Sequence, residues 1–226
     1  MARAPLFRNE PWVLAAILGA ALLVRLGWVG SVPTQPVTDF AWYLDRALAM
    51  ARGEGFSING VPTAYWPVGY PAALSVALRI FPGLDPVSVG KGLNLLLSVG
   101  CVGLTYAVGR ALSGRGVVGL IAAGVMALHP AMIAYSSILA AEPLFLCLVL
   151  GATWLSVFGA DRTWMWLAVG FLCGGAALVR PQAAVMPLLL VFGVWLWSRQ
   201  RGKNLLPLVA AGLALVGLIL ALTPWT

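Results

Sequence analysis

The sequence predicts an all-α membrane protein with about seven transmembrane helices. Hydrophobic residues make up 61% of the 226-residue chain and charged residues only 9%, whereas soluble domains carry about a quarter charged residues. The apolar residues also gather in long runs, and a membrane-spanning helix needs about 20 of them in succession. Together these observations indicate a single membrane domain over residues 1–226 and exclude a soluble globule.

Seven apolar runs are the expected spans. They are Trp12–Val32, Val87–Val108, Val117–Ile133, Pro143–Phe158, Trp164–Val179, Ala183–Trp197 and Leu205–Leu222. Several are shorter than a full bilayer crossing, which indicates tilt or helices that extend into their flanks. The first run is too long for the apolar region of a signal peptide and is expected to be retained. The three cysteines lie inside these runs without metal-ligand spacing, so we expect them to be packing residues.

The basic residues predict a cytoplasmic N-terminus. In that orientation eight of the 14 fall in inside segments: Arg3, Arg8, Arg110, Arg115, Arg162, Arg199, Arg201 and Lys203. This follows the positive-inside rule and indicates an integral protein of a plasma or inner membrane. Topology thus accounts for the basic residues, and nucleic acid is not expected as a partner. Five of the seven acids fall on the outer side instead, which favours chemistry at the extracytoplasmic face.

The first outer connection, residues 33–86, is much longer than the others, and such loops are usually functional. We predict a helix from Asp39 to about Arg52, capped by Thr38 or Asp39 and ended by Gly53.

One stripe of this helix is apolar, and Asp39, Tyr43 and Arg46 share another face, within about 60° of one another. The helix is therefore expected to lie along the membrane surface with these three residues toward an outer cavity. The alternative is an ordinary interfacial helix with a capping Asp39 and a solvated Arg46.

The remainder of the loop is rich in proline and aromatic residues. The segment Pro62–Pro71, which includes Tyr65 and Tyr70, is expected to be stiff and non-helical and to form a pocket wall. The alternative is that this segment is only a structured connector whose aromatic side chains lie at the membrane interface. A second short helix is predicted from Ala72 to Ile80.

These motifs resemble superfamily C of the membrane glycosyltransferases, nearest the protein mannosyltransferase and aminoarabinose transferase type. The resemblance follows the chain in order. It rests on Asp39 with Tyr43 and Ala47 behind it, Gly53–Phe56, Pro67–Pro71, Ser136–Phe145, Leu178–Pro181 and Thr223–Trp225. It covers the N-terminal seven-span module of such enzymes, which normally continue into further helices. It departs from them at Phe40, where many members carry a second acid.

The resemblance implies transfer of a sugar from a polyprenyl-phosphate donor to an acceptor at the extracytoplasmic face. An inverting displacement needs one carboxylate base and no covalent intermediate, and Asp39 is the candidate. A divalent cation is left open as a cofactor, and the acceptor is not identified. Two other classes compete: a non-catalytic module that binds lipid-linked sugar or assists a partner subunit, and a transporter. A transporter is disfavoured because transporters place ionisable residues near the bilayer midplane, whereas here they gather at the outer surface.

Charged residues at the outer ends of spans complete the candidate site. Glu142 precedes Pro143, and an acid there is costly unless it faces a cavity or a partner; a helix-start glutamate favoured by the helix dipole is the alternative. Arg180, Arg79 and Lys91 are candidates to hold the lipid phosphate. Snorkelling from span ends would explain each of these three cations equally well.

Overall fold

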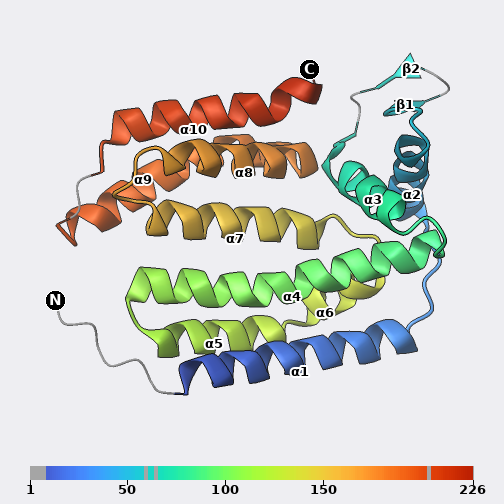
Figure 1. Cartoon of the computed structure of the whole chain (residues 1–226), viewed down its shortest axis with the longest axis horizontal. Coiled ribbons are helices and arrows are strands. Elements are labelled where there is room, and N and C mark those ends of the chain that lie inside the picture. The colour runs from blue at the N-terminus through green and yellow to red at the C-terminus, as the bar shows by residue number, and fades with distance from the viewer. Residues whose placement is uncertain (1–8, 59–60, 64–65, 203–204, 226) are drawn as a thin grey trace.

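The computed structural model describes residues 9–58, 61–63, 66–202 and 205–225, and the fold is a helical bundle (Figure 1). Its helices are α1 (Glu10–Ser31), α2 (Thr38–Ala51), α3 (Gly69–Ile80), α4 (Pro86–Ser113), α5 (Gly116–Ala127), α6 (Pro130–Ala134), α7 (Glu142–Phe158), α8 (Met165–Val179), α9 (Met186–Arg199) and α10 (Pro207–Leu222). Short 3-10 turns cover Tyr135–Ser137, Pro181–Val185 and Thr223–Trp225. A small antiparallel hairpin pairs β1 (Ser57–Ile58) with β2 (Val61–Pro62).

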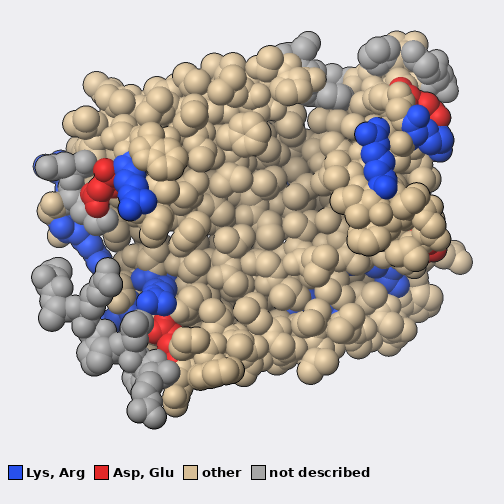
Figure 2. Space-filling view, viewed as in Figure 1, with Lys and Arg blue, Asp and Glu red and all other residues tan. Residues whose placement is uncertain are grey.

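The long helices lie side by side, so the bundle has two distinct ends (Figure 1). One end holds the start of α1 and the α4–α5, α7–α8 and α9–α10 connections. The opposite end holds α2, α3 and the β1–β2 hairpin, together with the start of α7 and the end of α8. Charged residues gather near both ends, with a broad band of other residues between them (Figure 2). This distribution is the one expected of a membrane protein.

Every predicted apolar run forms helix, but the helices differ in length. Three described helical segments are long and apolar enough to cross a membrane: Glu10–Ser31, Pro86–Ser113 and Pro181–Arg199. A fourth candidate is the pair Gly116–Ala127 and Pro130–Ser137, which is bent by 58°. The apolar helices α7, α8 and α10 are shorter, at 17, 15 and 16 residues. By length and composition the structure therefore supports three or four spans, and the prediction of seven requires that the three shorter helices also cross.

The bend between α5 and α6 is stabilised by Arg25 of α1. Pro130 lacks an N–H group and disfavours helix at the residue before it, so α5 ends with unpaired carbonyl groups. Arg25 is fully buried; its Nη1 donates to the carbonyl of Ala127 at 2.9 Å and its Nε to Ser98 Oγ at 2.7 Å. Arg25 thus joins a carbonyl at the broken helix to the hydroxyl of Ser98 on α4.

The contact between α8 and α10 brings the two backbones together. A Cβ atom added to Gly170 would lie 1.9 Å from the carbonyl oxygen of Ala214, and one added to Gly217 would lie 2.0 Å from that of Leu167. Gly170 and Gly174 are four residues apart, the spacing that lets helices approach closely in membranes. Glycine is therefore required on both helices of this pair.

The helix predicted from Asp39 to about Arg52 is present as α2, and its end before Gly53, which has a φ of +86°, is as expected. The predicted N-terminal cap was wrong. Thr38 is the first residue of α2, no side-chain cap is made, and the φ of +49° at Thr38 is strained for a β-branched residue.

The helix predicted from Ala72 begins three residues earlier, at Gly69. Pro71 is tolerated because the first N–H groups of a helix have no partner within it.

Gly217→Ala is expected to destabilise the protein by about 1–3 kcal/mol, because the added methyl group must displace backbone atoms of α8. Thermal unfolding in detergent measures this. Gly212→Ala, on the same helix, is the control, since a Cβ atom there meets nothing within 4 Å. Equal melting temperatures for the two variants would refute the close α8–α10 contact.

Candidate active site

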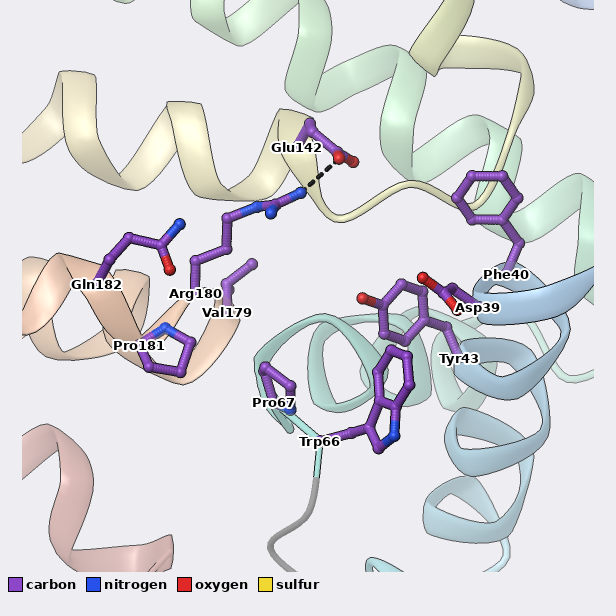
Figure 3. A pocket seen from close by; sticks show the side chains of 10 residues that line it. All are labelled: Asp39, Phe40, Tyr43, Trp66, Pro67, Glu142, Val179, Arg180, Pro181 and Gln182. Atoms are coloured by element: carbon purple, nitrogen blue, oxygen red, sulfur yellow. Dashed lines mark hydrogen bonds and ion pairs between the residues drawn. The ribbon is translucent and has the colours of Figure 1, made fainter.

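An open pocket of about 250 Å³ lies at the end of the bundle that carries α2 and α3 (Figure 3). Segments that are far apart in the sequence meet there: the start of α2, the chain before α3, the start of α7 and the end of α8. The pocket is lined by Asp39, Phe40, Tyr43, Trp66, Pro67, Glu142, Val179, Arg180, Pro181 and Gln182. The sequence placed Asp39 and Glu142 in one candidate site on the outer side, and the structure brings both to the same cavity.

Asp39 and Tyr43 form one side of this pocket. They lie one helical turn apart on α2, so their side chains project from the same face. Within the described part of the chain, the Asp39 carboxylate makes no hydrogen bond and no ion pair. It is therefore available to a ligand. It also directly follows the strained backbone of Thr38, and strained residues cluster at functional sites.

An aromatic cluster holds α2 in place over α3. The rings of Tyr43 and Tyr70 meet edge to face with centroids 5.4 Å apart, and Tyr70 is almost fully buried. Trp42 packs against Trp66 at 5.2 Å and against Phe56 at 5.5 Å. Such pairs add about 0.5–1.5 kcal/mol each beyond the area they bury. The cluster thereby fixes the face of α2 that presents Asp39.

The Tyr43 hydroxyl stays protonated in this setting. Burial raises the pKa of Tyr43 above its ordinary value, and the nearby carboxylates of Asp39 and then Glu142 raise it further, while Arg180 opposes them. A phenol that does not ionise near neutral pH is a hydrogen-bond donor. Tyr43 can therefore donate to an anionic or hydroxyl group in the pocket.

Glu142 and Arg180 form an ion pair on the other side of the pocket, with Nη2 and Oε1 2.5 Å apart (Figure 3). Glu142 is the first residue of α7, and Arg180 follows the last residue of α8 in an extended conformation. The two side chains are 32% and 39% exposed. A guanidinium group has five N–H donors, so pairing with Glu142 leaves Arg180 able to bind an anion.

Asn94 of α4 sets the position of Glu142. Its fully buried amide nitrogen donates to the carbonyl of Ile138 at 2.6 Å and of Ala140 at 3.0 Å. The chain there is irregular, and irregular backbone in an apolar environment must have its polar groups satisfied. Asn94 therefore holds the segment that leads directly into α7.

Gly69 sets the position of Arg180. A Cβ atom on Gly69 would lie 2.7 Å from the carbonyl carbon of Leu178 and 2.6 Å from Cγ2 of Val179. Only glycine allows the start of α3 to touch the end of α8 this closely. This contact explains the glycine in the motif Pro67–Pro71.

Three predicted cationic residues lie outside the pocket. Arg46 pairs with Asp45. Arg79 donates to the carbonyls of Met50 and Ala51, at the end of α2. Lys91 Nζ donates to the carbonyl of Val32, 3.2 Å away, just after α1. In this structure Arg79 and Lys91 thus bind carbonyl groups at helix ends.

The two remaining aromatic candidates also do not line the pocket. Tyr70 supports it from beneath Tyr43, and Tyr65 lies outside the described residues. Trp66 and Pro67, in the segment predicted to form a pocket wall, do line the pocket, whereas sequence reasoning missed Gln182. Gln182 directly follows the Arg180–Pro181 motif and lies in the 3-10 turn Pro181–Val185, so the motif was the signal that could have found it.

Fold and pocket together define the class of protein: a helical membrane protein with an acid- and arginine-lined pocket at one end of its bundle. A family model described as dolichyl-phosphate-mannose-protein mannosyltransferase matches residues 67–225, which is more than half of the chain. The chain belongs to this family, a glycosyltransferase family of superfamily C type. The match includes Glu142 and Arg180 and begins after Asp39 and Tyr43. No curated protein and no solved structure matched the chain.

Asp39→Asn is expected to lower the pKa of Tyr43, because it removes a negative charge that disfavours the phenolate. Ultraviolet difference titration of each form against its Tyr43→Phe counterpart isolates this group. The raised pKa also means that folding stability falls as pH rises past the ordinary tyrosine value, since the unfolded chain ionises first. An unchanged Tyr43 pKa in Asp39→Asn would contradict the proximity of the two groups.

Proposed function

We propose that this protein transfers a sugar from a polyprenyl-phosphate donor to an acceptor at the extracytoplasmic face, with inversion at the anomeric carbon. The observation that carries the proposal is the pocket itself. It brings Asp39, a carboxylate without a partner among the described residues, to the same cavity as Arg180. The family indicates a glycosyltransferase with a lipid-linked donor, and this pair supplies the two charges that such a reaction needs.

The proposed reaction is a single displacement. The acceptor hydroxyl oxygen attacks the anomeric carbon while Asp39 takes the hydroxyl proton. The bond from the anomeric carbon to the phosphate oxygen breaks, and the polyprenyl phosphate leaves with the bonding electrons. A positioned general base typically contributes about 10²–10⁴ in rate. Because attack and departure occur on opposite faces of the sugar, the configuration inverts.

Arg180 is assigned to the phosphate. A charge-assisted hydrogen bond from a guanidinium to the leaving oxygen stabilises the negative charge that develops there. Glu142 orients Arg180 through their ion pair, and Tyr43 donates a hydrogen bond from the opposite side. A divalent cation is not part of the proposal. Among the residues that the structure describes, no group of three or more His, Cys, Asp or Glu is placed to hold a metal ion.

A binding module is the second candidate function, and the extent of the family match favours it. The matched segment carries Glu142 and Arg180, the anion-binding half of the pocket, but not Asp39. A chain of this kind would bind a lipid-linked sugar and present it to a partner subunit or a further module.

The placement of the site on the outer face rests on charge. Arg110, Arg115, Arg162, Arg199 and Arg201 all lie at or beside the α4–α5, α7–α8 and α9–α10 connections, at the end of the bundle opposite the pocket (Figure 1). By the positive-inside rule that end is cytoplasmic. The pocket then faces the extracytoplasmic side.

Asp39→Asn should lower turnover by about 10²–10⁴ while leaving donor binding intact, because it removes proton acceptance and keeps the shape. The measurement is transfer from a polyprenyl-phosphate mannose by the full chain in detergent or liposomes, with binding of a polyprenyl phosphate followed separately. Arg180→Ala should instead weaken that binding by roughly 10- to 100-fold.

Each outcome separates the candidates. If the folded Asp39→Asn protein keeps near-normal turnover, Asp39 is not the base and Glu142 becomes the next candidate. If the wild-type chain binds polyprenyl phosphate but transfers no sugar, the binding module is the correct reading. Asp45→Asn is the control for turnover, because this acid also lies on α2 but does not line the pocket.

Cysteine labelling tests the orientation. A membrane-impermeant maleimide added to intact cells should label Ile58→Cys in the hairpin, whereas Arg162→Cys at the α7–α8 connection should react only after permeabilisation. Both positions are exposed, and the wild-type chain is the background control. Reaction of both cysteines from the same side would overturn the orientation and the outer placement of the pocket.

A further inference from the structure

Four arginines at the end of the bundle away from the pocket share one arrangement. Each follows an aromatic residue by four positions, so its guanidinium lies over that ring. The guanidinium carbon is 6.0 Å from the ring centroid in Tyr106–Arg110, 5.7 Å in Phe158–Arg162, 5.0 Å in Trp195–Arg199 and 5.1 Å in Trp197–Arg201. We call these four pairs the arginine–aromatic belt. They lie at or just beyond the ends of α4, α7 and α9.

The end of α9 carries two belt pairs and is tied to the end of α4. Arg201 Nη2 donates to the carbonyl of Leu112 at 3.0 Å, and Trp197 Nε1 donates to the same oxygen at 3.3 Å. The Arg199 guanidinium makes no hydrogen bond and no ion pair within the described part of the chain. Both arginines therefore lie at a fixed helix end, and most of their N–H donors have no partner among the described residues.

A cation–π contact does not use the N–H groups of a guanidinium, which lie in its plane. These N–H groups are the ones that bind phosphate oxygens in a bidentate fashion. The aromatic ring also restricts the side chain, so less conformational entropy is lost on binding. The belt thus presents preoriented phosphate donors.

The net charge of this end is positive. Five exposed arginines, Arg115 and the four of the belt, lie there beside two acids, Glu10 and Asp161. Glu10 is almost fully buried and accepts a hydrogen bond from Tyr106 and an ion pair from Arg110 at 3.2 Å. The charge of Glu10 therefore offsets that of Arg110, and the five arginines still outnumber the two acids at this end.

The belt borders apolar surface on its bundle side. On α9, the large side chains of Phe192 and Leu196 are 59% and 42% exposed one to two turns before Arg199. At the α7–α8 connection, Phe158 and Trp164 are 52% and 66% exposed. Aromatic rings at such a border lie at the level of lipid headgroups. The surface therefore combines an apolar face for acyl chains with cations for phosphate.

We propose that the arginine–aromatic belt binds the phosphate headgroups of anionic phospholipids, with Arg199 and Arg201 as the main contacts and Trp195 and Trp197 positioning them. This site lies at the end of the bundle opposite the Asp39 pocket and does not depend on it. Bound headgroups would fix the depth of α9 in the bilayer and link α9 to α4 through the phosphate as well as through Leu112.

Native mass spectrometry of the full chain from micelles with equal phosphatidylglycerol and phosphatidylcholine tests the proposal. Wild-type protein should retain phosphatidylglycerol preferentially, and the double variant Arg199→Gln/Arg201→Gln should lose roughly tenfold or more of that preference. Trp195→Leu/Trp197→Leu, which keeps both charges, should lose part of it. Arg52→Gln is the control, because it removes an exposed arginine that pairs with Glu54 on the pocket end.

Two results would overturn the proposal. One is retention of both lipids in the bath proportion by wild-type protein. The other is an equal loss of preference in Arg52→Gln, which would make net charge alone responsible. Thermal unfolding in detergent should shift upward with added phosphatidylglycerol but not with inorganic phosphate; an equal shift with both would mean that the site binds free anions and not phospholipid. Asp39→Asn should leave lipid preference unchanged, so failure here is distinguishable from failure of the proposed reaction.

Discussion

The contact between Gly69 and the end of α8 determines where the pocket forms. It brings the start of α3 against Leu178 and Val179, so that Pro67 and Arg180 become opposite walls of one cavity. On its other side α8 is held by α10 through Gly170 and Gly217. Arg180 is therefore placed by backbone contacts in two directions. A side chain added at Gly69, a residue outside the pocket lining, would move the cation on which donor binding is proposed to depend.

Buried polar side chains in this bundle donate hydrogen bonds to the carbonyl groups of irregular backbone segments. Arg25 binds the carbonyls that the α5–α6 bend leaves unpaired, and Asn94 binds those of the segment before Glu142. In an apolar environment each such group costs free energy unless it is paired. The two residues show that polar side chains inside this bundle support its shape, whereas the polar groups at its pocket end are left accessible.

The helical fold could be predicted from the sequence because apolar runs and glycine or proline boundaries are local signals. The same holds for α2 and for the meeting of Asp39 with Glu142, which followed from the placement of acids on one side. The pairing of Glu142 with Arg180 could not be predicted, since it depends on how α7 and α8 pack. Arg79 and Lys91 carry the same charge as Arg180, and only the structure shows that they bind carbonyls at helix ends. The strain at Thr38 left no signal in the sequence.

The unequal helix lengths have a consequence for how a lipid-linked substrate reaches the pocket. With a rise of about 1.5 Å per residue, the 28 residues of α4 outreach the 15 of α8 by a wide margin, and α4 extends past the ends of α7 and α8 in Figure 1. Glu142 and Arg180 thus lie in a recess below the level that α4 attains, beside α2 and α3. A hydrophobic mismatch of this kind draws the adjoining leaflet inward. A phosphate on an isoprenoid chain could then meet Arg180 sideways, without being lifted out of the bilayer.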